Sequence, residues 1–459
     1  MENQKEKISG KALIPFLVFI LVHMGTGLIL QSQGVDMAFY QLPAPVAAFV
    51  AVIFAFIMLD GSLDDKFNTF VKGCGDENIT IMCIIYILAG AFSTVSSAMG
   101  AVDSTVNFAL SLIPAHFITP GIFIISCFIS IATGTSVGTI AAVGPIAMGL
   151  AEKAGLNMPL VVAALLGGAM FGDNLSVISD TTIAATRTQG CEMRDKFRMN
   201  IMMALPAAII TIILLIIFGK PIEAVAATTH PYNIIKMLPY ILVLVTSLMG
   251  VNVFVVLTAG ILSSGVIGLI YKNFTLLVFG QQIYEGFLSM VEIFILSMLI
   301  GGLAQMVSEA GGIRWLLYKV SGMIKSRKSA EVGIAALVSL TDAATANNTI
   351  AIIINGPIAK GLSNKYKVDP RRSASLLDSF SCVMQGIIPY GAQVLIAIGL
   401  TNGAASPFQV MPLLWYQMLL GLLVIVSIFV PYTDGFIRRD PWNFEHDMPE
   451  HKVKAEAGN

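Results

Sequence analysis

Long apolar runs separated by short polar stretches extend over most of the chain. They reach from Ala12–Leu30 to Met411–Val430, and many approach the roughly 20 residues that a helix needs to cross a bilayer. Inside a membrane a helix satisfies its own backbone hydrogen bonds, whereas an isolated strand leaves them unpaired. The pattern therefore predicts an all-α polytopic membrane protein.

Four stretches at apparent membrane depth are too polar and too broken to be ordinary spans. They begin at Thr133, Gly172, Thr341 and Asp378, and read TGTSVGTIAAVG, GDNLSVISDTTIAAT, TDAATANNTIAIIINGP and DSFSCVMQGIIPYGAQ. Irregular backbone is tolerated at this depth only where it is buried in protein or lines a wet cavity. The sequence therefore predicts discontinuous helices at these places, either buried in protein or lining a cavity.

The two halves of the chain resemble each other. Gly90–Val102 lies over Gly301–Ile313 without a gap, and GPIAMGL from Gly144 lies over GPIAKGL from Gly356 at a nearly constant offset. Corresponding broken segments in two halves are typical of transporters built from repeats. We expect five parts: N-terminal helices over 1–78, a first repeat over 79–218, connecting helices over 219–286, a second repeat over 287–432 and a tail over 433–459.

Basic residues predict the orientation, because loops rich in Lys and Arg face the cytoplasm. Lys5, Lys7 and Lys11 place the N-terminus inside, and Arg438 with Arg439 places the C-terminus inside. The first helices of the two repeats then run in opposite directions, which predicts inverted repeats in a multi-pass protein of the cell membrane. The basic segment Arg187–Arg198 is expected to be a loop on the inner side. The basic stretch 360–372 disagrees with this scheme: either the number of helices differs there, or a re-entrant hairpin returns it to the inner face.

Composition supports the membrane assignment and excludes other classes. Hydrophobic residues make up 56% of the chain and charged residues 12%, about half of what soluble domains carry. A net charge of −1 provides no field that would attract nucleic acid. Five cysteines without a CxxC pair imply neither a disulfide framework nor a zinc site. The expected partners are the bilayer and a small ion or solute, with no cofactor apart from Na⁺ as a transported or coupling ion.

The segment 172–182 is the richest in oxygen ligands. A carboxylate within a membrane is costly and suggests a function, and carboxylate and hydroxyl oxygens suit a hard cation such as Na⁺. A carboxylate can hold either a cation or a proton, which is the physical basis of exchange. An isolated Asp here could instead cap a helix. The predicted binding residues of this segment are Asp173, Asn174, Ser176, Ser179, Asp180, Thr181 and Thr182, with Asp173, Asp180 and Ser176 as Na⁺ ligands.

The other broken segments supply further candidates. Gln385 aligns with Asp173 at the repeat offset, so the second half is expected to shape the site rather than to titrate. For 133–138, close helix packing through small residues is an equally good explanation. The candidates are Thr133, Thr135, Ser136, Asp342, Asn347, Asn348, Thr349, Asp378, Ser379, Gln385 and Tyr390.

Enzyme and pump signatures are weak or missing. Gly134–Gly138 satisfies the GxSxG pattern of hydrolases, but it lacks the strand–turn–helix context and a histidine partner. No GxxxxGK[ST] signature for ATP binding occurs in the sequence. We therefore predict neither an enzyme nor a primary pump.

The motifs resemble those of the NhaC-type sodium/proton antiporter family. FISIATGTSVGTI from Phe128 and the segment 172–182 are similar to the family's SLATGTSWGT and GDKxSPLSDTTNLA, while Asp378-Ser379 and Ile388–Tyr390 resemble its EDSGTVTSPLIPW stretch. The resemblance implies an inverted-repeat fold with two re-entrant hairpins, a homodimer with elevator-type motion, and sodium coupling. The family's Lys, Pro, Asn and Glu are replaced here by Asn174, Val177, Ile183 and Leu377.

The expected function is a sodium-coupled secondary transporter, most simply a Na⁺/H⁺ antiporter that works by alternating access. Losing the family's Lys at position 174 changes the charge of the site and leaves the solute open. The alternative is a Na⁺-driven carrier of a small organic acid or amino acid, with half-helix N-termini around its carboxylate. A passive channel would differ from both because its flux would be uncoupled.

Overall fold

The computed structural model describes residues 8–33, 35, 41–112, 114–177, 179–221, 232–249 and 251–457. Lys5 and Lys7, on which the predicted orientation partly rests, lie outside these residues. The described chain is helical apart from one pair of two-residue antiparallel strands near its end. This confirms the predicted all-α class.

The first half of the chain begins with a small N-terminal group of helices and continues with a longer series. The N-terminal elements are the 3-10 helix η1 (Gly10–Leu13), α1 (Ile14–Ser32), α2 (Ala44–Met58) and α3 (Leu63–Cys74). The series comprises α4 (Glu77–Met99), α5 (Ala101–Leu112), η3 (Ala115–Phe117), α6 (Ile118–Thr133), α7 (Ser136–Lys153), α8 (Met158–Leu175), α9 (Asp180–Gln189) and α10 (Met193–Phe218).

The second half begins with three connecting helices and continues with a similar series of helices. These connecting helices are α11 (Ile234–Leu248), α12 (Val253–Ile270) and α13 (Leu276–Ser289). The repeated series comprises α14 (Val291–Glu309), α15 (Gly312–Met323), α16 (Arg327–Thr345), α17 (Asn348–Tyr366), α18 (Pro370–Ile387), α19 (Ala392–Gly399), α20 (Pro407–Val410), η4 (Met411–Leu413) and α21 (Trp415–Phe429). The tail contains α22 (Gly435–Arg439), β1 (Trp442–Asn443), β2 (Met448–Pro449) and α23 (Glu450–Ala457).

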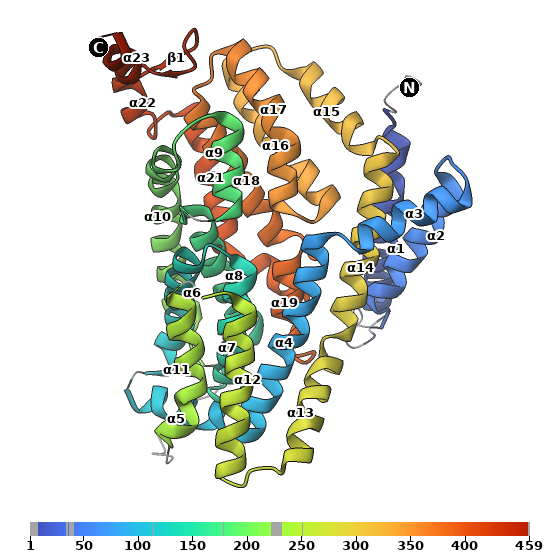
Figure 1. The fold of residues 1–459 in the computed structure, drawn as a ribbon, viewed down its shortest axis with the longest axis vertical. Coiled ribbons are helices and arrows are strands. Elements are labelled where there is room, and N and C mark those ends of the chain that lie inside the picture. The colour runs from blue at the N-terminus through green and yellow to red at the C-terminus, as the bar shows by residue number, and fades with distance from the viewer. Residues whose placement is uncertain are drawn as a thin grey trace.

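Each half contains a helical hairpin that turns back in the middle of the molecule. The α6–α7 turn passes through Gly134 at φ 69°, and the α16–α17 turn passes through Ala346 at φ 52°. Both residues are left-handed, a conformation that Gly adopts freely and that costs Ala roughly 1–2 kcal/mol. In Figure 1 α6 and α7 occupy the lower half of the view and α16 and α17 the upper half. The two hairpins therefore enter the centre from opposite ends.

Each half also contains a helix that breaks near the centre. Residues 176–179 separate α8 from α9, and residues 388–391 separate α18 from α19. Within the described residues, seven helices, counting each of these broken helices as one, are long and apolar enough to cross a membrane, or eight if the bent α20–α21 pair forms one span. Several of the apolar runs in the sequence, such as α2 and α6, are shorter than a span. Of these two, α6 forms one arm of the first hairpin, and α2 belongs to the N-terminal group of helices.

The hairpin explains the basic stretch 360–372. Because α17 reverses the direction of α16, it returns the chain to the end where Arg327 begins α16. The first described residues and the C-terminal tail lie at this same end in Figure 1. The re-entrant hairpin predicted as one explanation is therefore present.

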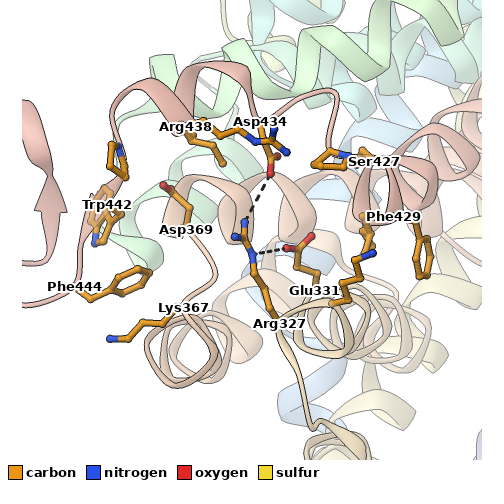
Figure 2. Close-up of a pocket in the computed structure, with 15 residues that line it drawn as sticks. Arg327, Glu331, Lys367, Asp369, Ser427, Phe429, Asp434, Arg438, Trp442 and Phe444 are labelled. Atoms are coloured by element: carbon orange, nitrogen blue, oxygen red, sulfur yellow. Dashed lines mark hydrogen bonds and ion pairs between the residues drawn. The ribbon is translucent and has the colours of Figure 1, made fainter.

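Charged contacts attach the C-terminal tail to the ends of both halves. The buried Arg371 pairs with Asp369 at 2.7 Å and donates to the Asp440 carbonyl at 2.6 Å. Lys452 pairs with Glu192 at 2.6 Å; this hydrogen bond and the lysine's charge lower the pKa of Glu192. Figure 2 shows Arg327 between Glu331 and Asp434 at a cavity of about 410 Å³ beside the tail. The tail is thus part of the packed structure.

Close backbone contact positions the broken helix of the first half. A Cβ atom at Gly172 would lie 2.2 Å from the Ser130 Cβ and 2.6 Å from the Ile131 backbone nitrogen. The Ser130 hydroxyl donates to the Ala169 carbonyl at 2.6 Å across the same contact. Glycine is therefore required for α8 to approach α6 this closely, which fixes the neighbouring Asp173 in place.

Candidate functional site

A cavity of about 130 Å³ lies where the two hairpin turns and the two broken helices meet. Its lining comes from both halves of the chain and contains ten of the residues predicted for the site. These are Thr135, Ser136, Asp173, Ser179, Asp180, Thr181, Asn347, Asn348, Thr349 and Gln385. Segments far apart in the sequence therefore converge as the repeat pattern predicts.

Asp173 is the buried carboxylate of this cavity. Its side chain is 4% exposed, on the last turn of α8. Its Oδ2 accepts a hydrogen bond from the Ser136 hydroxyl at 2.7 Å, and its Oδ1 accepts one from the Ser179 hydroxyl at 2.5 Å. Ser179 in turn lies 2.9 Å from the Thr181 hydroxyl. Both carboxylate oxygens thus accept hydrogen bonds from serines at the N-termini of α7 and α9.

Asp180 differs from Asp173 in its surroundings. It is the first residue of α9, lines the same cavity and is exposed. A carboxylate in the first turn of a helix is stabilised by the helix dipole. Asp180 therefore adds negative charge to the cavity at an accessible position.

Amide side chains connect the two halves beside Asp173. Gln393 Nε2 donates to the Ser136 hydroxyl at 3.0 Å, and Gln385 Nε2 donates to Gln393 Oε1 at 2.8 Å. Gln385 Nε2 also donates to the Ala346 carbonyl at 3.2 Å, in the turn of the second hairpin. This chain of hydrogen bonds runs from Ser136, which donates to Asp173, to the turn of the second hairpin at Ala346.

Thr135 and Asn347 have the same structural role in their two hairpins. The Thr135 hydroxyl accepts from the Gly138 backbone N–H at 3.3 Å, and Asn347 Oδ1 accepts from the Ile350 backbone N–H at 3.0 Å. Both side chains are therefore N-caps of the returning helix. They shape the cavity through the backbone that they hold.

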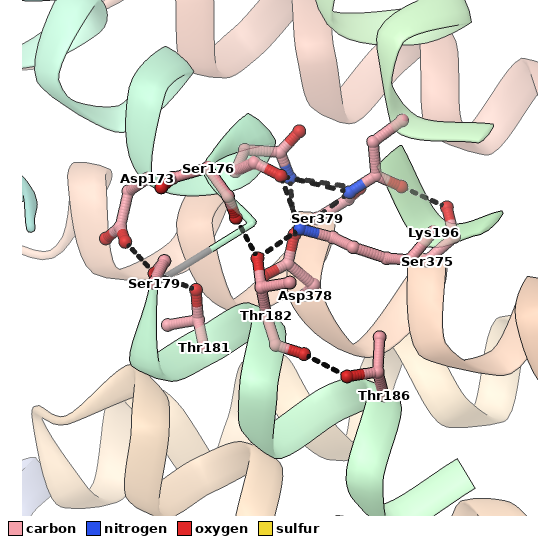
Figure 3. Close-up of polar contacts among 12 residues, drawn as sticks. Asp173, Ser176, Ser179, Thr181, Thr182, Thr186, Lys196, Ser375, Asp378 and Ser379 are labelled. Carbon is pink, nitrogen blue, oxygen red and sulfur yellow. Dashed lines mark hydrogen bonds and ion pairs between the residues drawn. The ribbon is translucent and has the colours of Figure 1, made fainter. Parts of the chain in front are cut away.

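A buried ion pair lies next to the cavity and joins the halves. Lys196 Nζ on α10 is 2.7 Å from Asp378 Oδ2 on α18, and both side chains are 0% exposed. The Asn174 and Asn200 amides each donate to the same Asp378 oxygen at 2.9 Å. Lys196 also donates to the Thr182 hydroxyl at 2.6 Å. Figure 3 shows this cluster to the right of Asp173, Ser179 and Thr181.

Lys196 and Asn200 were not predicted as site residues, although the sequence contains a signal for them. The sequence reading assigned Arg187–Arg198 to a basic inner loop, whereas Lys196 lies inside α10. Residues 196, 199, 200, 203, 204 and 207 are all buried, at the spacing of one helix face. Extending the apolar face of α10 backwards would have placed Lys196 and Asn200 on it.

The remaining predicted residues lie around the cavity without lining it. Ser176 donates to the Ile131 carbonyl at 2.8 Å and Thr182 to the Ser176 carbonyl at 2.7 Å, so both hold the break after α8. Tyr390 donates to the Ala343 carbonyl at 2.6 Å. The remaining residues of this kind are Thr133, Asn174, Asp342, Asp378 and Ser379.

The electrostatics of the cavity combine two opposing contributions. Helices α7, α9, α17 and α19 all begin at it, and each N-terminus carries roughly half a positive charge. Asp173 and Asp180 supply the negative charge, and no Lys, Arg or His occurs among its described lining residues. Within the described part of the chain, no group of three or more His, Cys, Asp or Glu could hold a metal ion. The cavity thus combines two carboxylates with four helix N-termini.

A polytopic helical fold with two broken helices, two hairpins and a shared internal cavity defines the class of membrane transporters. Residues 6–220 and 222–433 match the model of the Na⁺/H⁺ antiporter family, so this chain belongs to that family. The resemblance to NhaC-type antiporters in the sequence motifs is thereby confirmed.

Curated relatives cover most of the chain. The malate-2H⁺/Na⁺-lactate antiporter of Bacillus subtilis is 25% identical over 92% of this chain and 96% of its own length. The Na⁺/H⁺ antiporter NhaC of the same species is also 25% identical, over 80% of this chain and 85% of its own length. The arginine/ornithine antiporter ArcD of Halobacterium salinarum is 23% identical over 99% of this chain and 98% of its own length. The chain is therefore similar to secondary antiporters that differ in solute.

Proposed function

We propose that this protein exchanges Na⁺ for H⁺ at Asp173. The observation that carries the proposal is a buried carboxylate on a cavity shared by both halves, with each oxygen held by a serine hydroxyl. A hydroxyl can donate to the carboxylate or turn a lone pair toward a cation. Ser136 and Ser179 can thus assist Asp173 in both of its occupied states.

Competition for one carboxylate supplies the coupling. An ionised Asp at this depth is costly unless it is paired, so either Na⁺ or a proton must neutralise Asp173. Because the two ions exclude each other at that position, the site changes sides with one of them and returns with the other. Exposed Asp180 raises the local cation concentration at the cavity.

The two-fold arrangement of the hairpins supports alternating access. We propose that the halves are inverted repeats and that the site alternates between the two ends from which the hairpins enter. Elevator-type motion, a homodimer and a cell-membrane location with both termini in the cytoplasm stay predictions. The position of the first described residues and the tail at one end of the molecule agrees with the last of these.

A second candidate function is Na⁺-linked transport of a small organic acid or amino acid. The four helix N-termini around the cavity favour it, because a carboxylate can accept hydrogen bonds there. The relatives with 92% and 99% coverage include carriers of malate, lactate, arginine and ornithine. With no basic side chain among the described lining residues, the cavity suits Na⁺ better than a dicarboxylate.

Reconstitution in liposomes tests the proposal. An imposed Na⁺ gradient should drive proton movement in the wild type. Asp173→Asn should lower it by about 100-fold, since losing a charged ligand costs about 3 kcal/mol. Asp103→Asn, at an exposed pair with Lys153, is the matched control and should stay within about twofold of the wild type.

Two outcomes would contradict the proposal. Either the wild type moves no protons under a Na⁺ gradient, or Asp173→Asn exchanges like the control. If Na⁺ instead drives uptake of labelled lactate, malate or arginine without a proton signal, the second candidate function is correct.

A further inference from the structure

Asp342 is a second buried carboxylate, with different surroundings from Asp173. It lies on the last turns of α16, is 0% exposed, and precedes the left-handed turn at Ala346. Among the described residues, none forms a hydrogen bond with either carboxylate oxygen, although the Gln385 backbone is close by. The adjacent Thr341 hydroxyl and the Asn348 amide nitrogen have no partner among those residues either.

The other buried carboxylates of the central region show why this matters. Asp173 has two serine donors, and Asp378 has Lys196 with two amides. No Lys, Arg or His in the described chain forms an ion pair with Asp342. Burying an ionised carboxylate without compensation costs several kcal/mol, while the neutral acid costs far less. Among the described residues, no ion pair therefore offsets the cost of charging Asp342 in this conformation.

Residues next to Asp342 line two different cavities. Gln385, whose backbone lies near Asp342, lines the cavity that contains Asp173. Tyr390, which donates to the carbonyl of the next residue Ala343, lines a second cavity of about 340 Å³ together with His23 and Glu292. Tyr390 and Cys382 are titratable side chains that lie near enough for the charge of Asp342 to act on them. Asp342 therefore lies between the proposed cation site and a separate cavity that contains titratable groups.

We propose that Asp342 is a proton-binding site distinct from the cation site at Asp173. Its proton exchanges with the cavity lined by His23, Glu292 and Tyr390, and the carboxylate forms only when movement of the second hairpin on Na⁺ binding gives it a polar environment. The inference rests on the proposed function, because it assigns a second proton to the same transport cycle. One Na⁺ would then be exchanged against protons from two carboxyl groups.

The dependence of Na⁺ affinity on pH measures this directly. Binding of Na⁺ to the full chain in detergent would be followed by thermal stabilisation across pH values. The slope of log Kd against pH reports the number of protons released per Na⁺. Asp342→Asn mimics the neutral acid, so it should retain Na⁺ binding while the slope falls by about one proton relative to the wild type. The exposed Asp64→Asn on α3 is the control and should keep the wild-type slope.

Each result separates this inference from the proposed function. An Asp342→Asn slope equal to that of the wild type would overturn the inference. Loss of Na⁺ binding in Asp173→Asn would support the cation site independently. If Asp173→Asn bound Na⁺ normally while Asp342→Asn lost one proton, the proposed function would fail and the proton site would stand.

The wild type supplies a readout that needs no variant to fold. Dicyclohexylcarbodiimide modifies protonated carboxyl groups in apolar surroundings, and the modified peptide can be identified by mass spectrometry. Labelling of Asp342 at pH 8, with the exposed Asp64 unmodified, would support the inference. An unmodified Asp342 under conditions that label other membrane carboxyl groups would overturn it.

Discussion

The two broken helices have the same backbone plan and different chemistry. In the first half the last turn of α8 presents Asp173, which only accepts hydrogen bonds when ionised. In the second half the last turn of α18 presents Gln385, which donates to Ala346 and Gln393. Gln385 is the position that aligns with Asp173 in the repeat. The last turn of α8 thus presents a group that can change charge, and the last turn of α18 presents one that cannot.

This difference suggests a division of labour between the halves. At these two aligned positions, the first half supplies a charge that a cation or proton must neutralise, and the second half supplies a neutral donor that holds its own hairpin turn. The halves share one buried ion pair, Lys196 with Asp378. Variants at these positions test whether the contrast between the halves is correct.

The largest expected effect follows from removing Lys196. Lys196→Met leaves Asp378 charged and buried without its cation, which should lower the free energy of unfolding by about 3–5 kcal/mol. Equilibrium unfolding in mixed micelles measures the change. Lys153→Met, in an exposed pair with Asp103, should cost under about 1 kcal/mol.

The double variant Lys196→Met with Asp378→Asn checks the cause. It removes both charges, so it should recover much of the lost stability. If the double variant is as unstable as Lys196→Met alone, packing by the lysine chain rather than the ion pair joins the halves.

The next effect compares the glycines near the two breaks. Gly172→Ala would push a Cβ atom to 2.6 Å from the Ile131 backbone nitrogen, whereas Gly386→Ala meets Gln417 and Met170 side-chain atoms at 3.0 Å. Both changes gain the same helix propensity, roughly 0.5–1 kcal/mol. Because backbone cannot yield as side chains do, Gly172→Ala should be less stable than Gly386→Ala by about 2 kcal/mol.

Thermal unfolding and Na⁺ binding measured on both glycine variants would test the comparison. Gly172→Ala should also weaken Na⁺ binding, since it moves the neighbouring Asp173. Equal stability of the two variants would mean that α6 can shift away from α8, and that the first half is less rigid than its contacts indicate.

The sequence was sufficient to predict the fold class, the two hairpins and most of the cavity lining. Polar segments at membrane depth must be buried in protein or line a cavity, and their occurrence in both halves indicated that they meet. Asp173, Gln385 and Asn347 were all predicted and all line the cavity. The pattern could not predict which side-chain oxygens face the cavity and which form hydrogen bonds with the backbone.

Two features needed the three-dimensional structure for a physical reason. Lys196 was read as part of a basic loop, because a charge near a helix end usually reaches solvent, yet here it lies on the buried face of α10. Ser176 was predicted as a Na⁺ ligand, but its hydroxyl donates to the Ile131 carbonyl and it does not line the cavity. Both outcomes depend on which helix packs against the break, and spacing alone does not encode that.

The smallest expected effect concerns the amide of the second half. Gln385→Met keeps a similar volume but leaves the Ala346 carbonyl and Gln393 Oε1 without their donor. The loss of these hydrogen bonds should cost about 1–2 kcal/mol of unfolding free energy. Because the carboxylates remain, Na⁺ affinity measured by thermal stabilisation should change by less than about threefold, equivalent to about 0.7 kcal/mol.

Comparing the loss of stability with the loss of Na⁺ affinity in Gln385→Met distinguishes two roles for this residue. If Gln385→Met lowers Na⁺ affinity as far as Asp173→Asn does, the amide oxygen of Gln385 is itself a cation ligand, and the halves contribute equally to the site. If stability falls while affinity holds, the second half acts through its hairpin turn, with Gln385 and Gln393 joining that turn to the Ser136 that holds Asp173. Of the two aligned positions, in the last turns of α8 and α18, only the one in the first half would then bind the ion directly.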